Sequence, residues 1–378
     1  MTFKPEQHCL ASLLDIKPYQ PGKSVEDLEK SATALKAIKL SSNENALGPS
    51  RRAIAAMCDY ADQVHLYPSG SGLLLKDKLA ERHDISANRI TLGNGSNELL
   101  EFVARCFLDK SKNAVYSEHA FEVYALATRI SGASAHRAMP RTTDDEMPYG
   151  HDLNRFLEVI DGHTAVVFIA NPNNPTGTWI KEAELRKFMQ SVDEHIIVVV
   201  DQAYAEYAQV SDYPDASKWL DEYPNLIVIQ TFSKIYALAG LRIGYAFSSV
   251  EIADLFNRLR QPFNNNVLAL KAAIASLDDT AHLEKSVQMN NEGLAYLSDG
   301  CSKLGLKCLP SAANFLCIEI GKQAPLIYNA LLEQGVIIRA IENYDMPQYL
   351  RVTVGSAEQN QRFLETLKQI LEREQWKT

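Results

Sequence analysis

The chain has 378 residues, of which 46% are hydrophobic and 22% are charged, and its formal net charge is −9 at pH 7. A chain of this length can bury one large core and a smaller one, so two domains are expected. The acidic balance and the lack of any basic run argue against nucleic acid as a partner, and no apolar run approaches the roughly 20 residues of a membrane span.

The six cysteines are scattered, without metal-type or CxxC spacing. This usage is typical of reduced thiols in a cytosol and gives no sign of a metal site. The opening residues lack the apolar core of a signal peptide. We therefore expect a cytoplasmic protein.

Over the first two thirds of the chain, short β-branched runs alternate with longer amphipathic stretches, which predicts a parallel sheet with crossover helices. Strands are predicted at residues 89–92, 114–116, 165–170, 196–200, 226–229 and 242–247, and helices include 97–108 and 181–192. From about Pro262 the pattern changes to a long helical region, 267–304, followed by short strands near 314–320 and 350–354. The expected fold class is α/β, with a second, smaller α+β domain.

Polar residues follow several of these strands, at the edge where open α/β sheets bind ligands. The loop 93–97 (GNGSN) leads into a helix whose free N–H groups can hold a phosphate, although such a loop taken alone is more often a glycine turn with Ser96 or Asn97 as an N-cap. The loop 171–177 (NPNNPTG) is a rigid turn that can also fix an amide against a ligand. Asp201 follows another strand, at a position where a lone aspartate is usually a helix cap.

The segment TFSKIYALAGLRIGY, residues 231–245, places Lys234 after an apolar strand and Arg242 eight residues later. One cofactor, pyridoxal phosphate, explains five features that occur near strand ends: a phosphate cup, an amide, a carboxylate, a lysine and an arginine. This cofactor needs a lysine for its Schiff base, a carboxylate that keeps its ring nitrogen protonated, donors to its ring oxygen, and cations or amides around its phosphate. The residues that meet these needs in turn are Lys234; Asp201; Asn174 and Tyr204; and Arg242, Thr231, Ser233, Gly95 and Ser96.

These motifs resemble those of the fold type I pyridoxal-phosphate aminotransferases of class I/II, and within that group the histidinol-phosphate aminotransferases. The resemblance runs in order through IKPYQPGKS, SSNENALGPS, YPSGSGLLLKDKLA, GNGSNELLEFVA, HAFEVYALAT, NPNNPTG, VVVDQAYAEY, TFSKIYALAGLRIGY and GVIIRAIENYDMPQYLRVTVG, and spans nearly the whole chain. It implies a large domain, residues 45–262, with a mainly parallel seven-stranded sheet between helices. Residues 1–44 and 263–378 are then expected to form the small domain.

Carried onto this sequence, the resemblance makes Lys234 the residue that joins the cofactor and afterwards moves the proton between substrate and cofactor. Burial and the nearby Arg242 are expected to favour the neutral form of this lysine. Asp201 is implied to pair with the ring nitrogen, and Asn174 and Tyr204 to bond the ring hydroxyl. The phosphate cup is implied to extend to Asn97.

Two aromatic residues are implied to contact the cofactor. Phe121 in HAFEVY matches the side chain that stacks on the ring, where the family more commonly has tyrosine, and a core aromatic is the alternative interpretation. Tyr67 in YPSGSG matches the residue that reaches the cofactor phosphate of the neighbouring subunit, with a turn tyrosine as the alternative. The expected assembly is a homodimer with shared active sites.

Substrate choice depends on a second set of residues. Arg351 in LRVTVG matches the arginine that holds the anionic end of a substrate, and Arg339 in GVIIRA matches an arginine associated with a substrate phosphate. Two guanidinium groups suit a dianion better than a single carboxylate. Tyr19 in KPYQPG and Asn264 in RQPFNNN are implied to line the same pocket.

The expected reaction exchanges the amino group of L-glutamate with imidazole acetol phosphate, giving L-histidinol phosphate and 2-oxoglutarate. An aromatic amino acid aminotransferase is the nearest alternative, and a threonine-phosphate decarboxylase is the alternative from another reaction class. A ligand-sensing regulator on the same fold would need an added DNA-binding domain, for which the chain has neither spare length nor basic charge.

Overall fold

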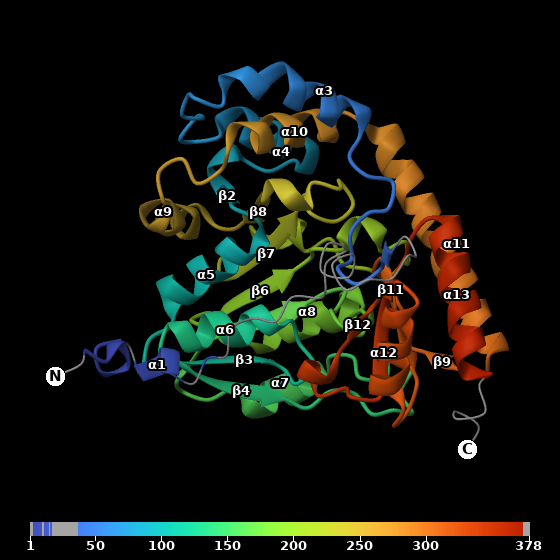
Figure 1. Cartoon of the computed structure of the whole chain (residues 1–378). Coiled ribbons are helices and arrows are strands. Elements are labelled where there is room, and N and C mark those ends of the chain that lie inside the picture. Colours follow the sequence, from blue (N-terminus) through green and yellow to red (C-terminus); the bar gives the residue numbers. More distant parts are fainter. Residues whose placement is uncertain (1–2, 10, 15, 17–36, 373–378) are drawn as a thin grey trace.

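The computed structural model describes residues 3–9, 11–14, 16 and 37–372, and its largest sheet has seven strands (Figure 1). In spatial order these are β2 (Ile90–Gly93), β8 (Gly244–Phe247), β7 (Leu226–Thr231), β6 (Ile197–Asp201), β5 (Thr164–Ala170), β3 (Asn113–Ser117) and β4 (Ser134–Ala138). Only β8 runs against its neighbours. The predicted mainly parallel seven-stranded sheet is confirmed.

The edge strand β4 is the strand of this sheet that the sequence pattern does not predict. Its sequence, SAHRA, holds no apolar run, and only its last residue is buried. An edge strand has one neighbour and one solvated side, so it does not need the continuous apolar character by which buried parallel strands are found.

Helices cover both faces of the sheet, and successive strand residues point to opposite faces. One face packs against α5 (Ser96–Phe107), α6 (Glu122–Ile130) and α9 (Val250–Leu259). The other packs against α3 (Arg51–Tyr60), α4 (Leu73–His83), α7 (Leu153–Val159), α8 (Glu182–Ser191) and α10 (Val267–Leu277). On β6, for example, Val199 belongs to the first core, and Val198 and Val200 to the second.

A smaller unit, coloured orange to red in Figure 1, contains a four-stranded antiparallel sheet in the order β12-β13-β10-β9. Its strands are β12 (Arg339–Ala340), β13 (Tyr349–Thr353), β10 (Phe315–Glu319) and β9 (Lys307–Cys308), and its helices are α11 (Thr280–Lys303), α12 (Ala324–Glu333) and α13 (Ala357–Leu371). β1 (Ile38–Lys39) pairs in parallel with β11 (Val336–Ile337), so the segment before the large sheet joins this unit.

α10 packs with the large sheet, although it follows the predicted domain boundary at residue 262. Ala269, Ala272 and Leu277 of α10 lie in the core of the large sheet, against α3 and α4. Leu297 on α11 is the first residue after α10 that is buried in the core of the small unit. α10 therefore packs with the large sheet, because a change of sequence texture marks a change of secondary structure and not a change of packing partner.

The carboxyl ends of β2, β3, β5, β6 and β7 meet at one edge of the large sheet. Because β8 is antiparallel, its beginning lies at the same edge. The small unit contributes β12 and β13 to this side. Elsewhere, α1 (Ala11–Leu14) lies beside α6 (Figure 1), and no helix of the described residues is long and apolar enough to cross a membrane.

Candidate active site

A cavity of about 230 Å³ opens beyond the carboxyl ends of the large sheet, between that sheet and the small unit. Residues from strand ends that are far apart in sequence meet here because parallel strands finish at the same edge. The predicted site residues that line the cavity are Ser96, Asn97, Phe121, Asn174, Asp201, Tyr204, Thr231, Ser233, Lys234, Arg242, Arg339 and Arg351.

Lys234 follows β7, and its Nζ donates a hydrogen bond to the Ser42 carbonyl at 3.1 Å. The same nitrogen lies 5.6 Å from the centre of the Tyr204 ring. Burial lowers the pKa of Lys234 to about 8, and the positive charge of Arg351 contributes more than that of Arg242. The neutral form of Lys234 is thus favoured, as expected. The cation that lowers its pKa more is Arg351 of the small unit, and not the predicted Arg242.

Asp201 ends β6 and is 5% exposed. Its Oδ2 accepts a hydrogen bond from the Tyr124 hydroxyl at 2.9 Å, and its Oδ1 accepts one from the Ala203 amide at 3.2 Å. Burial raises the pKa of Asp201 to about 6, although both hydrogen bonds and the charge of Lys234 oppose that change. The carboxyl is therefore mainly ionised at pH 7, and retains acceptor capacity on both oxygens.

The cup at the start of α5 has no room for an extra side chain. Gly95 has φ +80°, and a Cβ at this residue would lie 2.4 Å from Nη2 of Arg242. A Cβ at Gly244, across the cup, would lie 2.8 Å from the Ser96 amide nitrogen. The free amides at the N-terminus of this 12-residue helix, the Arg242 guanidinium and the Ser233 hydroxyl form a set of donors suited to a phosphate. The Thr231 hydroxyl donates to Ser233 Oγ at 3.0 Å and so supports that set.

Arg339 and Arg351 are direct cross-strand partners on β12 and β13. Residues opposite each other in an antiparallel pair share one face, so both guanidinium groups belong to the same side of the small sheet. Arg351 donates through Nη1 to Oδ1 of Asn174 and through Nη2 to the Ser41 carbonyl at 2.8 Å. Its Nε is buried and has no hydrogen-bond partner among the described residues.

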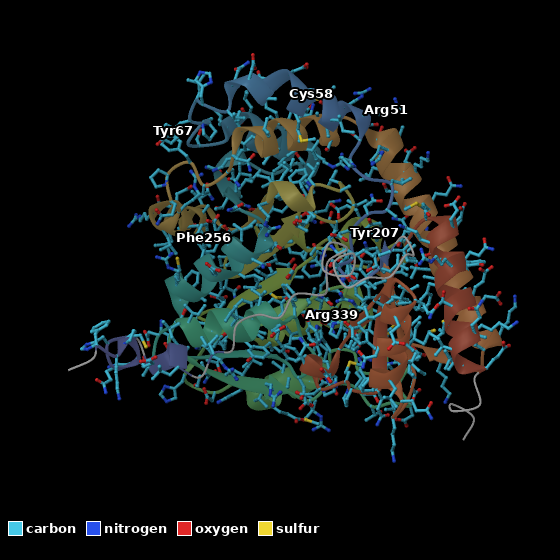
Figure 2. The ribbon with its side chains drawn as sticks, in the orientation of Figure 1. Arg51, Cys58, Tyr67, Tyr207, Phe256 and Arg339 are labelled. Atoms are coloured by element: carbon cyan, nitrogen blue, oxygen red, sulfur yellow. The ribbon has the colours of Figure 1, made fainter. Side chains whose placement is uncertain are left out.

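Three predicted site residues in the described part of the chain, Gly95, Tyr67 and Asn264, do not line this cavity. Gly95 borders it behind Arg242, and Tyr19 lies outside the described residues. Tyr67 is 83% exposed and stacks on Phe263 at 4.7 Å between ring centres. Figure 2 shows Tyr67 at the outer edge of the α3–α4 end, well away from Arg339.

The prediction that Asn264 lines the pocket differs from its position in this chain. Its amide nitrogen donates to Glu98 Oε2 at 2.6 Å and to the Leu92 carbonyl at 3.3 Å, and its Oδ1 accepts from Arg260 at 3.0 Å. These bonds hold the 260–266 loop to the outer side of the β2–α5 connection. The amide nitrogen is therefore used to tie the loop to β2 and α5, and Asn264 is not among the residues that line the cavity.

Sequence reasoning assigned no role to several lining residues, among them Ser42, Asn43, Tyr124 and Tyr344. Asn43 has φ 55° and donates through its amide to the Tyr204 hydroxyl at 2.9 Å. The polar run SSNEN, residues 41–45, was the available signal for Asn43, because a run so polar directly after the short strand β1 implies hydrogen-bond partners. Tyr124 lies three residues after Phe121, which places both on one side of α6.

The strand order of the large sheet and the lysine at its edge define fold type I of the aminotransferases. Residues 36–367 match the family model Aminotransferase class I and II, and the chain belongs to that family. A relative from Methylococcus capsulatus named Histidinol-phosphate aminotransferase 2 is 49% identical over 356 residues, covering 94% of this chain and 96% of the relative. A relative of the same name from Pseudomonas aeruginosa is 47% identical, covering 94% and 95%.

A solved structure supports the same relationship. The crystal structure of histidinol-phosphate aminotransferase from Sinorhizobium meliloti in complex with pyridoxal-5'-phosphate superimposes with a TM-score of 0.86 at 26% identity. The match covers 96% of each chain.

Proposed function

We propose that this chain is a pyridoxal-phosphate-dependent aminotransferase that interconverts L-histidinol phosphate and 2-oxoglutarate with imidazole acetol phosphate and L-glutamate. The observation that carries the proposal is the placing of Lys234 and Asp201 in one cavity with the cross-strand pair Arg339 and Arg351. The relatives at 49% and 47% identity bear the matching name.

The residues present fit pyridoxal phosphate on three counts. The cup between Gly95 and Gly244 is closed to any larger side chain and is lined by donors for a phosphate. Asp201 offers a buried acceptor for a protonated ring nitrogen. The Tyr204 hydroxyl and the Asn174 amide lie in the same cavity as potential partners of a ring oxygen.

When bound, the cofactor supplies an electron sink that makes the carbon bearing the substrate amine acidic. The chain's own contribution is to hold and move protons around that carbon. Lys234, with its pKa near 8, is a base when neutral and an acid when charged, so one side chain can remove a proton and return it elsewhere. Asp201 keeps its negative charge opposite the ring nitrogen, and Phe121 covers the ring in this proposal.

The substrate phosphate is assigned to Arg339 and Arg351. Two like charges opposite each other on a sheet repel, so their pairing favours binding of a dianion between them. The unpartnered Nε of Arg351 is a buried donor available to such a group. In this arrangement the large sheet holds the cofactor, and the small unit holds the end of the substrate.

The test of the substrate is a single-turnover titration of the cofactor-loaded enzyme with L-histidinol phosphate and, separately, with L-phenylalanine. Rapid conversion by histidinol phosphate alone is expected. Equal or better conversion by phenylalanine would identify an aromatic amino acid aminotransferase, and release of carbon dioxide from threonine phosphate would identify a decarboxylase.

Replacing Arg339 tests the phosphate assignment directly. Arg339→Gln is expected to weaken binding of histidinol phosphate by about 2–4 kcal/mol and to leave glutamate little changed, because only the former carries a phosphate. Arg137→Gln is the matched control, since Arg137 pairs with Asp345 at 2.9 Å on the surface and is half exposed. Equal losses for both substrates would place Arg339 in a structural role.

The proposed assembly is a homodimer that shares its active sites. A group of exposed apolar side chains on α3, the following loop and α4 supports it: Ile54, Val64, Leu66, Tyr67, Leu73 and Leu74, with Phe263 beside Tyr67. Exposed apolar patches of this kind typically mark interfaces between proteins. A cytoplasmic location is supported by the six cysteines, all of which are free thiols.

A further inference from the structure

Tyr124 is a cavity residue to which the proposed chemistry gives no role. It lies on α6, its side chain is 0% exposed, and its hydroxyl donates to Asp201 Oδ2 at 2.9 Å. The two residues are 77 positions apart in the chain, so this contact is made by the tertiary structure alone. A buried tyrosine hydroxyl usually finds a hydrogen-bond partner, and here the partner is the carboxylate assigned to the ring nitrogen of the cofactor.

We propose that Tyr124 is a positioning residue whose hydroxyl orients the Asp201 carboxylate and holds it in its ionised form for the ring nitrogen of the cofactor. The inference rests on the proposed function, because it assigns Asp201 the same partner.

The ring of Tyr124 is fixed from several sides. It stacks on Phe168 of β5, with ring centres 5.0 Å apart and planes at 5°. Phe121 meets it edge to face at 5.9 Å, and Tyr116 of β3 lies 6.5 Å away. A ring held in this way cannot swing its hydroxyl off the carboxylate without losing its packing.

One helical turn then supplies two parts of the site. Phe121 is the N-cap residue of α6, and the Tyr124 amide bonds the Phe121 carbonyl at 3.0 Å. Phe121 lines the cavity where the cofactor ring is assigned, and Tyr124 reaches the carboxylate assigned to that ring's nitrogen. The first turn of α6 therefore sets the ring and its counter-charge relative to each other.

The electrostatics support the same role. The hydrogen bond from Tyr124 lowers the pKa of Asp201 against the effect of burial, as do the Ala203 amide and the charge of Lys234. Burial and the nearby Asp201, Tyr204 and Tyr344 raise the pKa of Tyr124 well above its usual value. Tyr124 therefore keeps its proton across the working pH range and remains a donor.

The test compares Tyr124→Phe with Tyr116→Phe. Both substitutions remove one hydroxyl from the same apolar cluster, and Tyr116 forms no hydrogen bond to Asp201 in the described part of the chain. Phenylalanine preserves the stacking on Phe168, so both variants are expected to fold, which thermal unfolding of the apoenzyme checks.

Two readouts are measured. In the apoenzyme, infrared difference spectroscopy follows protonation of the Asp201 carboxyl, identified by its loss in Asp201→Asn. Tyr124→Phe should raise the midpoint by about one pH unit, since a hydrogen bond to a charged group is lost. In the loaded enzyme, kcat should fall about 10-fold, with KM for both substrates changed less than about two-fold. Tyr116→Phe should match the wild type in both the midpoint of Asp201 protonation and kcat.

The inference requires both effects. An unmoved midpoint in Tyr124→Phe, or a kcat equal to that of Tyr116→Phe, overturns it and leaves Tyr124 as a packing residue. Failure of the proposed function is a separate result, because the wild type would then transfer no amino group. The infrared midpoint of the apoenzyme would still show whether Tyr124 controls the charge of Asp201.

Discussion

At the scale of single residues, the site depends on the charge state of Lys234. Its pKa of about 8 means that the amine gains substantial neutral fraction near physiological pH, whereas an exposed lysine, with a pKa near 10.5, stays almost fully charged. Only the neutral amine attacks a carbonyl or accepts a proton. Burial and Arg351 together therefore make this lysine reactive, and that effect can be measured without any substrate.

The rate at which the apoenzyme captures pyridoxal phosphate should report this pKa. Below about pH 8 the neutral fraction of Lys234 grows roughly tenfold per pH unit, and above it the rate should level off. Arg351→Gln removes the nearby positive charge, so the midpoint should move to higher pH. Stopped-flow absorbance measures the rate, with Arg339→Gln as a control that lines the same cavity.

A wild-type midpoint near 10.5 would contradict the assigned environment of Lys234. A midpoint unchanged by Arg351→Gln would show that burial alone lowers the pKa. Both results are independent of which substrate the enzyme prefers.

At the scale of structural elements, the loop between β2 and α5 is built around a backbone that only glycine adopts easily. Gly95 and Gly132 have nearly equal φ values, +80° and +78°, but a Cβ at Gly132 would meet nothing within 4 Å. The two positions thus separate the cost of the backbone conformation from the cost of filling the cup.

Gly95→Ala should lower the affinity of the apoenzyme for pyridoxal phosphate by at least about 10-fold, because the new methyl group displaces the Arg242 guanidinium. Gly132→Ala should leave this affinity unchanged. Each substitution should cost about 1–2 kcal/mol in free energy of unfolding, from the left-handed conformation. Fluorescence titration measures the affinity for pyridoxal phosphate, and denaturant unfolding measures the free energy of unfolding. Equal affinities in the two variants would show that the phosphate does not bind in the cup at Gly95.

At the scale of the whole molecule, the position of Tyr67 bears on whether two copies of the chain share their active sites. Within its own chain Tyr67 lies outside the cavity and is 83% exposed. A role at the cofactor phosphate then requires a second copy of the chain. In a symmetric dimer each copy would offer its Tyr67 to the other.

Hybrid dimers test this sharing. The Lys234→Ala homodimer should be nearly inactive, and the Tyr67→Ala homodimer should be impaired. In a mixed dimer, one site combines the wild-type Lys234 of one subunit with the wild-type Tyr67 of the other. Random mixing of equal amounts should therefore restore about a quarter of wild-type activity, since half the dimers are mixed and each has one intact site of two. If Tyr67 acted within its own chain, mixing would restore nothing. Sedimentation of the unmixed proteins checks the dimer.

The sequence by itself determined much of the fold and most of the cavity. Buried parallel strands are continuous apolar runs, and the residues that follow them reach a common edge, so Asp201 and Lys234 were found from local pattern. The resemblance to a family added Phe121, Arg339 and Arg351 as lining residues. Local pattern failed at β4, which is an exposed edge strand, and although it predicted a helix at α10 it gave no sign that this helix packs with the large sheet.

Only the tertiary structure decided how these residues meet. The register of β12 against β13 puts Arg339 opposite Arg351, and the packing of α6 on the sheet brings Tyr124 to Asp201. The same long-range packing binds the Asn264 amide to Glu98 of α5 and leaves Tyr67 outside the cavity. The physical reason is that propensity and periodicity act over a few neighbouring residues, whereas register, packing and burial are set by partners tens to hundreds of residues away.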